Sequence, residues 1–248
     1  MSARQPLLGA VCCTLLLLAS VELSATPDIP GVDAEQFPAP VQAALGDARA
    51  DLEQALEDSA SPDRLAAAWG HYGDLLFVHE LLAQARIAYA QARALQPGDQ
   101  AWPYLQALVE LSANDPAAAA GFLDTVLEMA PRDVPALLRR GRIQLEAGRP
   151  ERAERDFARA RELAPSAPAA LGGLGRVALA AGRYQDAMDY LERALALDPA
   201  ASQLHHSLGM AYRGLGDIEQ ARYHLERRGN RPATINDPLL DAVRGKSR

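Results

Sequence analysis

The sequence predicts an all-α solenoid built from antiparallel pairs of helices. Apolar residues make up 49% of the 248-residue chain and are mostly Ala and Leu, which favour helices and are poor strand formers. A proline that ends a helical pattern recurs every 34 residues, at Pro97, Pro131, Pro165 and Pro199. Because proline stops a helix and a fixed period is typical of repeat architectures, we expect one helix-pair unit in each period.

Small, turn-forming and bulky residues keep fixed places within this period. Aligned on the prolines, the chain divides into five repeats of 34 residues: 66–99, 100–133, 134–167, 168–201 and 202–235. In the fourth repeat, Gly175 and Ala187 at the eighth and twentieth positions let two antiparallel helices approach closely. Gly182 at the fifteenth position ends the first helix, and Leu191 at the twenty-fourth is bulky. Equivalent residues recur in other repeats, which indicates two amphipathic helices in each.

The segment before the repeats is expected to cover the first end face of the array, which would otherwise be exposed. Residues 26–39 are predicted to be a Pro-rich tether, and residues 40–65 an N-terminal cap. Apolar residues at helical spacing predict one amphipathic helix over 40–58. Ser61 is a favourable N-cap and Pro62 a favourable first residue for the helix that follows.

The segment after the repeats is expected to close the other end. The fifth repeat loses the pattern after Leu225, so we interpret it as the degenerate end of the array. Residues 236–248 are predicted to be a C-terminal cap and tail. Within them, Asp237 and Pro238 favour the start of a short closing helix.

The first 25 residues predict a secretory signal peptide. Arg4 is the only charge ahead of an apolar run from Leu7 to Val21, and this order is typical of such signals. A membrane span needs about 20 apolar residues, more than the run provides. We therefore expect cleavage after Ala25 and a periplasmic or secreted protein; an uncleaved membrane anchor is the alternative.

Few groups in the chain are suited to catalysis or metal binding. Both cysteines, Cys12 and Cys13, lie inside the predicted signal, so the mature chain has no disulfide, no thiolate nucleophile and no Cys-based zinc site. His205, His206 and His224 form the one local histidine cluster. Adjacent residues on a helix point about 100° apart, so these three are not expected to converge on a metal. We therefore predict no catalytic site, no cofactor and no enzyme activity.

Charge is divided unevenly along the chain, whose formal net charge is -7. Residues 26–130 hold 4 Arg against 16 Asp and Glu, a net charge of -12. Residues 131–248 hold 20 Arg and Lys against 15 Asp and Glu, a net charge of +5. The acidic front half disfavours electrostatic binding of nucleic acid, which needs a basic face. The basic back half keeps a nucleic-acid-binding repeat protein open as an alternative.

The repeat unit resembles the tetratricopeptide repeat (TPR) family. The run LGGLGRVALAAGRYQDAMDYLERALALDP in the fourth repeat fits the family pattern almost throughout, and Trp69 supplies the aromatic expected early in the first repeat. Two repeats depart from the pattern. Glu80 stands where the first repeat should have its turn glycine. In the second repeat, Trp102 falls one residue early, and the turn at Asn114 is expected one residue late.

The resemblance implies a right-handed superhelical solenoid with a groove for a partner protein or peptide. In the family, the first helix of each repeat lines the concave face. Carried over by position, that face is predicted to hold Asp74, Phe77, Val78, Glu110, Leu138, Arg142, Leu145, Arg176, Leu179, His206, Met210 and Arg213. The groove is then apolar at its front and cationic at its back. Arg142 and Arg176 take equivalent positions in consecutive repeats, where they can hold ligand carboxylates.

The sequence therefore predicts a non-enzymatic scaffold for protein–protein interaction. We expect it to take no small-molecule substrate and to contact a membrane only if the signal peptide is retained. Arg outnumbers Lys 24 to 1, a composition typical of a GC-rich genome. The predicted cleaved signal peptide makes a Gram-negative bacterium the expected source. The first alternative is an assembly factor for envelope machinery, of the cytochrome c maturation or pilus biogenesis type. The second is the nucleic-acid-binding repeat protein.

Overall fold

The computed structural model describes residues 28–246, and this part of the chain is helical without strands. The predicted signal peptide therefore lies outside the described residues. The elements, in chain order, are η1 (Ala34–Gln36, a 3-10 turn), α1 (Ala39–Glu57), α2 (Pro62–Val78), α3 (Leu82–Leu95), α4 (Ala101–Ser112), α5 (Pro116–Met129), α6 (Val134–Glu146), α7 (Pro150–Leu163), α8 (Pro168–Ala180), α9 (Tyr184–Leu197), α10 (Gln203–Leu215), α11 (Ile218–Glu226) and α12 (Pro238–Gly245). Over residues 28–246, none of these helices combines the length and hydropathy needed to cross a membrane.

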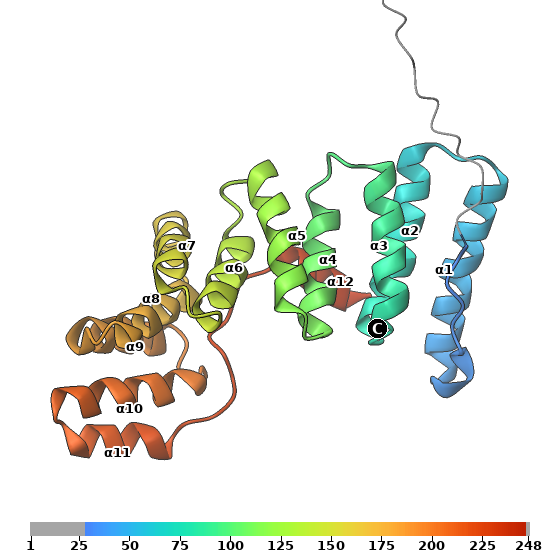
Figure 1. The fold of residues 1–248 in the computed structure, drawn as a ribbon. Helices are drawn as coiled ribbons and strands as arrows, with labels where there is room; N and C mark the ends of the chain where they lie inside the picture. The colour runs from blue at the N-terminus through green and yellow to red at the C-terminus, as the bar shows by residue number, and fades with distance from the viewer. Residues whose placement is uncertain (1–27, 247–248) are drawn as a thin grey trace, which may run out of the picture.

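The five repeats are five antiparallel helix pairs stacked in sequence order, each packed on the next (Figure 1). The pairs are α2/α3, α4/α5, α6/α7, α8/α9 and α10/α11. We call α2, α4, α6, α8 and α10 the first helices, and the side of the array that they line the concave face. The predicted fold class, a right-handed superhelical solenoid of helix pairs, is confirmed.

Within a pair, the helices meet where a small residue faces a bulky one. A Cβ atom added to Gly175 would lie 2.6 Å from Leu191 Cγ and 3.2 Å from the carbonyl oxygen of Ala187. One added to Gly209 would lie 2.8 Å from Leu225 Cγ. The eighth position of a repeat must therefore be small because the twenty-fourth side chain fills the space opposite it. The twentieth residue contributes its backbone to the same contact.

The first helix of every repeat ends at a residue with left-handed backbone geometry. Gly148, Gly182 and Gly216 have φ of +69°, +71° and +85°, and Glu80 and Asn114 have φ of +62° and +59°. Asn114 thus occupies the same fifteenth position as the glycines, and the predicted late turn in the second repeat is wrong. Asn adopts this conformation more readily than other side chains do, because its short amide can bond locally. Glu80 has no such advantage and is strained.

The N-terminal segment lies against the helices that follow it. The described part of the predicted tether, residues 28–38, packs its apolar side chains against the core of α1 and α2. The Tyr72 hydroxyl donates to the carbonyl oxygen of Pro30 at 3.0 Å, which fixes this segment on α2. The predicted N-cap at Ser61 is confirmed, since its hydroxyl oxygen accepts from the amide of Arg64 at 3.3 Å.

The C-terminal segment returns along the array, and α12 is not packed on the last repeat. We call residues 228–246 the C-terminal strap. In Figure 1 it leaves α11 and runs back past α6, and α12 then packs on α2 at the front of the array. The predicted helix is present, and the Asp237 side chain caps it by accepting from the amide of Leu240 at 3.0 Å. The helix packs at the front of the array and not at the predicted far end, because Leu240 and Val243 bury their apolar side chains in the front core.

Candidate protein-interaction surface

Polar contacts fasten the C-terminal strap to the concave face at intervals. At its start, the amide of Gln203 on α10 donates to the carbonyl oxygen of Arg231 at 2.9 Å. Further on, Asp198 accepts from the amide and hydroxyl of Thr234 at 2.9 and 2.7 Å. The strap therefore crosses the surface on which the sequence places the partner groove.

At the front of the concave face, the strap meets Asp74 on α2. This side chain is 8% exposed, and it accepts from the Tyr89 hydroxyl at 2.9 Å and from Lys246 Nζ at 2.5 Å. Burial raises the pKa of the Tyr89 hydroxyl, and the Asp74 charge raises it further, so Tyr89 stays a donor. Phe77 and Val78 lie beside this contact and share a cavity of about 420 Å³ with Arg244 of the strap.

Besides Asp74, two predicted groove residues do not offer their side chains to a partner. Leu138 is buried in the core. Glu110 is 4% exposed, and its two carboxylate oxygens accept from Arg86 at 2.7 Å each. Glu110 belongs to the predicted groove only in a shifted register of the second repeat, and the position of Asn114 rules that register out. In the unshifted register the fifth position of that repeat is Tyr104, and Tyr104 does lie on the concave face.

Tyr104, Arg139 and Asp237 form a buried polar cluster where the strap crosses α4 and α6. Asp237 Oδ2 accepts from the Tyr104 hydroxyl and from Arg139 Nη2, both at 2.5 Å. Arg139 Nε also donates to the Tyr104 hydroxyl at 2.9 Å. The Arg139 and Asp237 side chains are 11% and 4% exposed. We call Tyr104 and Arg139 the carboxylate seat, because together they enclose one carboxylate oxygen of the strap.

The electrostatics of the carboxylate seat keep Arg139 charged and Tyr104 neutral. Burial opposes the charge of Arg139, but Tyr104 and Asp237 outweigh it and hold the arginine pKa above its usual value. Burial raises the pKa of the Tyr104 hydroxyl. Asp133, the N-cap of α6, lies close enough to be affected: burial raises its pKa, and the charge of Asp237 adds to that shift. The seat thus accepts a carboxylate, while Asp133 repels the one it holds.

Behind the seat, Arg142 on α6 and Arg176 on α8 take equivalent positions in consecutive repeats. Arg176 is 3.9 Å from Glu146, a loose and exposed pairing. Arg142 is half-buried, and within residues 28–246 no carboxylate oxygen lies within 4.0 Å of its guanidinium. Burial lowers the pKa of Arg142, and the charges of Arg139 and Arg176 lower it further, whereas Glu146 acts in the opposite direction. Arg142 is therefore a desolvated cation that an added carboxylate would stabilise.

A cavity of about 410 Å³ opens at the back of the concave face. Its lining includes Arg176 on α8, His206 and Ser207 on α10, and Arg228 and Asn230 of the strap. The remaining predicted groove residues are half-buried or exposed along the same helices: Leu145, Leu179, Met210 and Arg213. The back of the face therefore combines an open cavity with a cationic lining.

The histidines of the last repeat form a pair. His205 Nδ1 lies 2.8 Å from His224 Nδ1, and the ring of Tyr212 stacks on His224. His206 points into the cavity described above and takes no part. Over residues 28–246, no three His, Cys, Asp or Glu side chains are grouped as metal ligands. Burial lowers the pKa of both His205 and His224, which favours their neutral forms.

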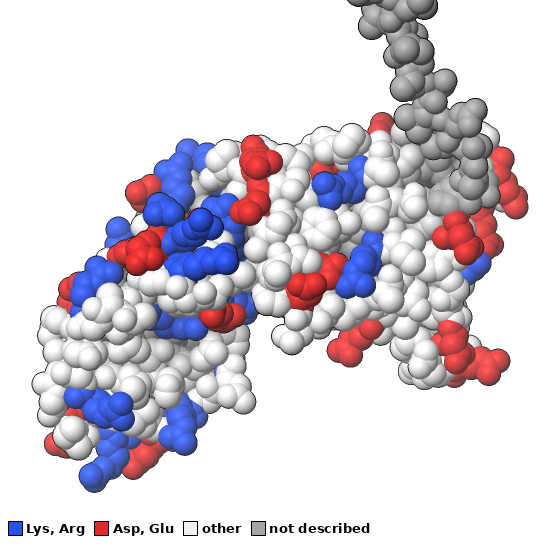
Figure 2. Space-filling view, in the orientation of Figure 1, with Lys and Arg blue, Asp and Glu red and all other residues white. Residues whose placement is uncertain are grey.

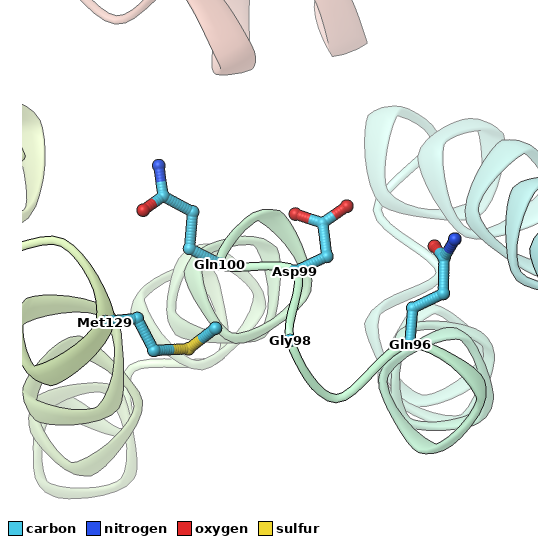
Figure 3. Close-up of a pocket in the computed structure, with 5 residues that line it drawn as sticks. All are labelled: Gln96, Gly98, Asp99, Gln100 and Met129. Carbon is cyan, nitrogen blue, oxygen red and sulfur yellow. The ribbon is translucent and has the colours of Figure 1, made fainter.

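Another cavity, of about 490 Å³, lies between the α3–α4 loop and the end of α5. Figure 3 shows Asp99 and Gln100 pointing away from the loop, with Met129 reaching towards it from α5. Asp99 is already engaged, because it accepts from the amide of Ala101 at 2.8 Å at the start of α4. This cavity offers one occupied carboxylate and no second titratable group, so it provides no acid–base pair.

Solved structures of repeat proteins share this fold. A tetratricopeptide repeat protein from Parabacteroides merdae matches with a TM-score of 0.63 and 19% identity, over 82% of this chain and 78% of that one. YrrB, described as a TPR protein with an unusual peptide-binding site, matches with a TM-score of 0.60 and 19% identity, over 73% of this chain and 91% of that one. MamA from Desulfovibrio magneticus matches with a TM-score of 0.60 and 18% identity, over 65% of this chain and 92% of that one. At such identities the likeness shows the fold alone.

The sequence itself matches at the level of the repeat. No curated protein matches it. Models of the tetratricopeptide repeat match residues 104–168, 138–202 and 178–238, which together span the second to the fifth repeat. The chain belongs to the tetratricopeptide repeat family.

Proposed function

We propose that this protein is a non-enzymatic scaffold that holds a segment of a partner protein against the back of its concave face. The observation that carries the proposal is Arg142, a half-buried guanidinium with no carboxylate in ion-pair range among the described residues. A partly buried charge without a partner is unfavourable, so a ligand that supplies a carboxylate is bound preferentially. No comparable observation supports catalysis, because no acid–base pair lines the cavities described above.

The chemistry of the back of the face fits an acidic, extended peptide. Arg142 and Arg176 present planar guanidiniums that bond carboxylates in a forked geometry. The adjoining cavity of about 410 Å³ has room for side chains of such a peptide. Figure 2 shows Lys and Arg gathered over α6 and α7 and acidic side chains towards α1. With net charges of +5 for residues 131–248 and -12 for residues 26–130, long-range attraction of an acidic segment favours the back half of the array. YrrB offers a precedent for peptide binding by this fold.

We further propose that the protein is exported and acts in the periplasm or outside the cell. Support comes from the sequence of residues 1–25 alone, with its Arg4 start and its short apolar run. N-terminal sequencing of the protein from an envelope fraction tests this proposal. A mature chain that begins near Thr26 is expected, and a membrane-bound chain that keeps its first residues would overturn it.

Site-directed photo-crosslinking tests the binding face. A photoreactive amino acid replaces His206 at the back cavity or, as the control, Arg193 on the exposed side of α9. Irradiation of the native envelope should yield one discrete adduct from position 206 and none from position 193, and mass spectrometry then identifies the partner. Equal capture from both positions would refute a concave binding face. Nucleic acid in the adduct, with a salt-dependent gel shift, would favour the nucleic-acid-binding alternative.

A further inference from the structure

The C-terminal strap contacts the concave face in the way that a bound peptide would. Its polar anchors are side chains that reach first helices distant in sequence: Asp237 reaches Arg139, and Lys246 reaches Asp74. Its apolar anchors are Leu240 and Val243, the two buried residues of α12. Between the α11 end and Asp237 the strap has no helix of its own. The strap therefore docks as an extended segment followed by a short helix.

The carboxylate seat is specific for an acidic residue. Arg139 and Tyr104 both direct donors at one oxygen of Asp237, at 2.5 Å. If Asp237 left, Arg139 would keep its place near Arg142, whose pKa is lowered by burial and further by the charges of Arg139 and Arg176. Arg139, which is 11% exposed, would then have lost the carboxylate that the strap supplies. An empty seat favours another acidic residue over an apolar one.

Several features make the strap easier to displace than a repeat helix. α12 has only 8 residues, and a helix of that length does not persist alone in water. Lys246 is 42% exposed, so its pairing with Asp74 is open to solvent. Asp133 carries a like charge near Asp237, which is why the charge of Asp237 contributes to the raised pKa of Asp133. Of the strap's polar anchors, Asp237 is thus opposed by a like charge and Lys246 is open to solvent.

We propose that the C-terminal strap is a displaceable intramolecular ligand, and that the partner segment that replaces it has the same chemistry. That segment carries an aspartate at the start of a short helix, two apolar residues on one face of the helix and a cation at its end. The inference rests on the proposed scaffold function, and it adds that the front of the face is closed until the strap leaves. A tethered ligand has an effective concentration in the millimolar range, so a free segment competes poorly with an intact strap.

Binding of the strap's own sequence in trans tests the proposal. The probe is a synthetic peptide of residues 230–246 with a fluorophore at its N-terminus, titrated with the full chain and followed by anisotropy. In one variant, Asp237→Asn removes the strap carboxylate and leaves Tyr104 and Arg139 intact. The matched control is Asp241→Asn, which changes an exposed acid on the same helix. A second opening variant, Val243→Asn, removes an apolar anchor without touching the seat.

Both opening variants should bind the peptide at least tenfold more tightly than the wild-type chain and the Asp241→Asn control. A peptide that itself carries Asp237→Asn should bind the opening variants no more tightly than it binds the wild-type chain. Circular dichroism melting checks that each variant is folded. If neither opening variant gains affinity, the strap is a fixed part of the fold and the proposal is overturned. A wild-type dimer with exchanged straps, detected by light scattering, would assign the seat to a second copy and overturn the partner part of the proposal.

The result of the peptide experiment is independent of the result of the photo-crosslinking experiment that tests the proposed function. The peptide experiment does not use the unidentified partner or the photoreactive residue at position 206. A failed peptide experiment with a discrete adduct at position 206 removes the strap proposal and leaves the scaffold standing. A successful peptide experiment with no adduct shows a displaceable strap on a face that binds no envelope partner.

Discussion

Asp237 and Arg139 form an ion pair that joins positions 98 residues apart in the sequence, with Oδ2 and Nη2 at 2.5 Å. The pair lies between the strap and α6, and both side chains are nearly buried. Breaking a buried pair by removing one partner costs about 3–5 kcal/mol when the other charge has no escape. Here Asp237 can escape, because the strap that carries it can leave the surface. Removing Arg139 therefore lowers stability by no more than the free energy that holds the strap on the array.

This reasoning predicts a local effect for Arg139→Met. Amide exchange in α12 should become at least tenfold faster, equivalent to about 1.4 kcal/mol, because the strap loses its carboxylate partner. Exchange in α9 should stay at the wild-type rate. Arg159→Met is the control, since it removes an arginine that forms an exposed ion pair with Glu162 on α7. Unchanged exchange in α12 of the Arg139 variant would show that the pair does not hold the strap.

Packing between the two helices of a repeat predicts opposite effects for two helical glycines. Gly175→Leu should lower the free energy of unfolding by about 1–3 kcal/mol, because its side chain meets Leu191. Gly121→Ala should raise it by about 0.5–1 kcal/mol, since nothing lies within 4 Å of the added Cβ and Ala favours the helix. Denaturant unfolding measures both. A neutral Gly175→Leu variant would contradict the close approach of α8 and α9.

The turn of the first repeat predicts a stabilising substitution. Glu80 has a φ of +62°, and left-handed geometry costs about 1–2 kcal/mol for a residue with a Cβ. Glu80→Gly should therefore raise the melting temperature, by the equivalent of up to about 1 kcal/mol after the extra chain entropy of glycine is subtracted. Gly182→Ala, at the same position of the fourth repeat and in open space, should lower it. A fall for both variants would mean that Glu80 is not strained.

The histidine pair predicts a loss of stability in mild acid. Burial lowers the pKa of His205 and His224 below 6.5, and Arg227 adds to the shift while Glu192 opposes it at His224. Below pH 6.5 the unfolded chain therefore binds protons that the folded chain does not, and stability decreases as the pH falls. Melting temperatures from pH 7.5 to pH 5 should show the loss. It should shrink in His205→Gln and persist in His71→Gln, which changes an exposed histidine.

The repeat fold could be predicted because its signals are local and periodic. Gly182 marks a turn on its own, and the same residue type recurs at the same spacing. Asn114 shows the limit of this reasoning, because residue type alone did not reveal that its backbone adopts the same geometry as the glycines. The predicted register of the second repeat is therefore shifted by one residue. It places Glu110 in the groove, although Glu110 is buried against Arg86, and it leaves out Tyr104.

The path of the strap could not be predicted from the sequence. Asp237 signals the start of a helix, since capping involves only the next few residues. The place where that helix packs depends on Arg139 and on the front core, and no spacing in the sequence connects these segments. The sixth position of a repeat, where Arg139 lies, is also outside the groove positions carried over from the family. The carboxylate seat thus became visible only in three dimensions.

Arg142 and Arg176 give the sharpest test of the binding face, once crosslinking has supplied the partner. Arg142→Ala with Arg176→Ala should keep the melting temperature near wild type, because the one ion pair removed is exposed and contributes about 0–1 kcal/mol. The Kd for the partner should rise at least tenfold, about 1.4 kcal/mol, since two forked carboxylate contacts are lost. Arg159→Ala with Arg183→Ala removes the same charge from α7 and from the N-cap of α9, where both arginines form exposed ion pairs. Equal binding by the two double variants would place the partner on another surface.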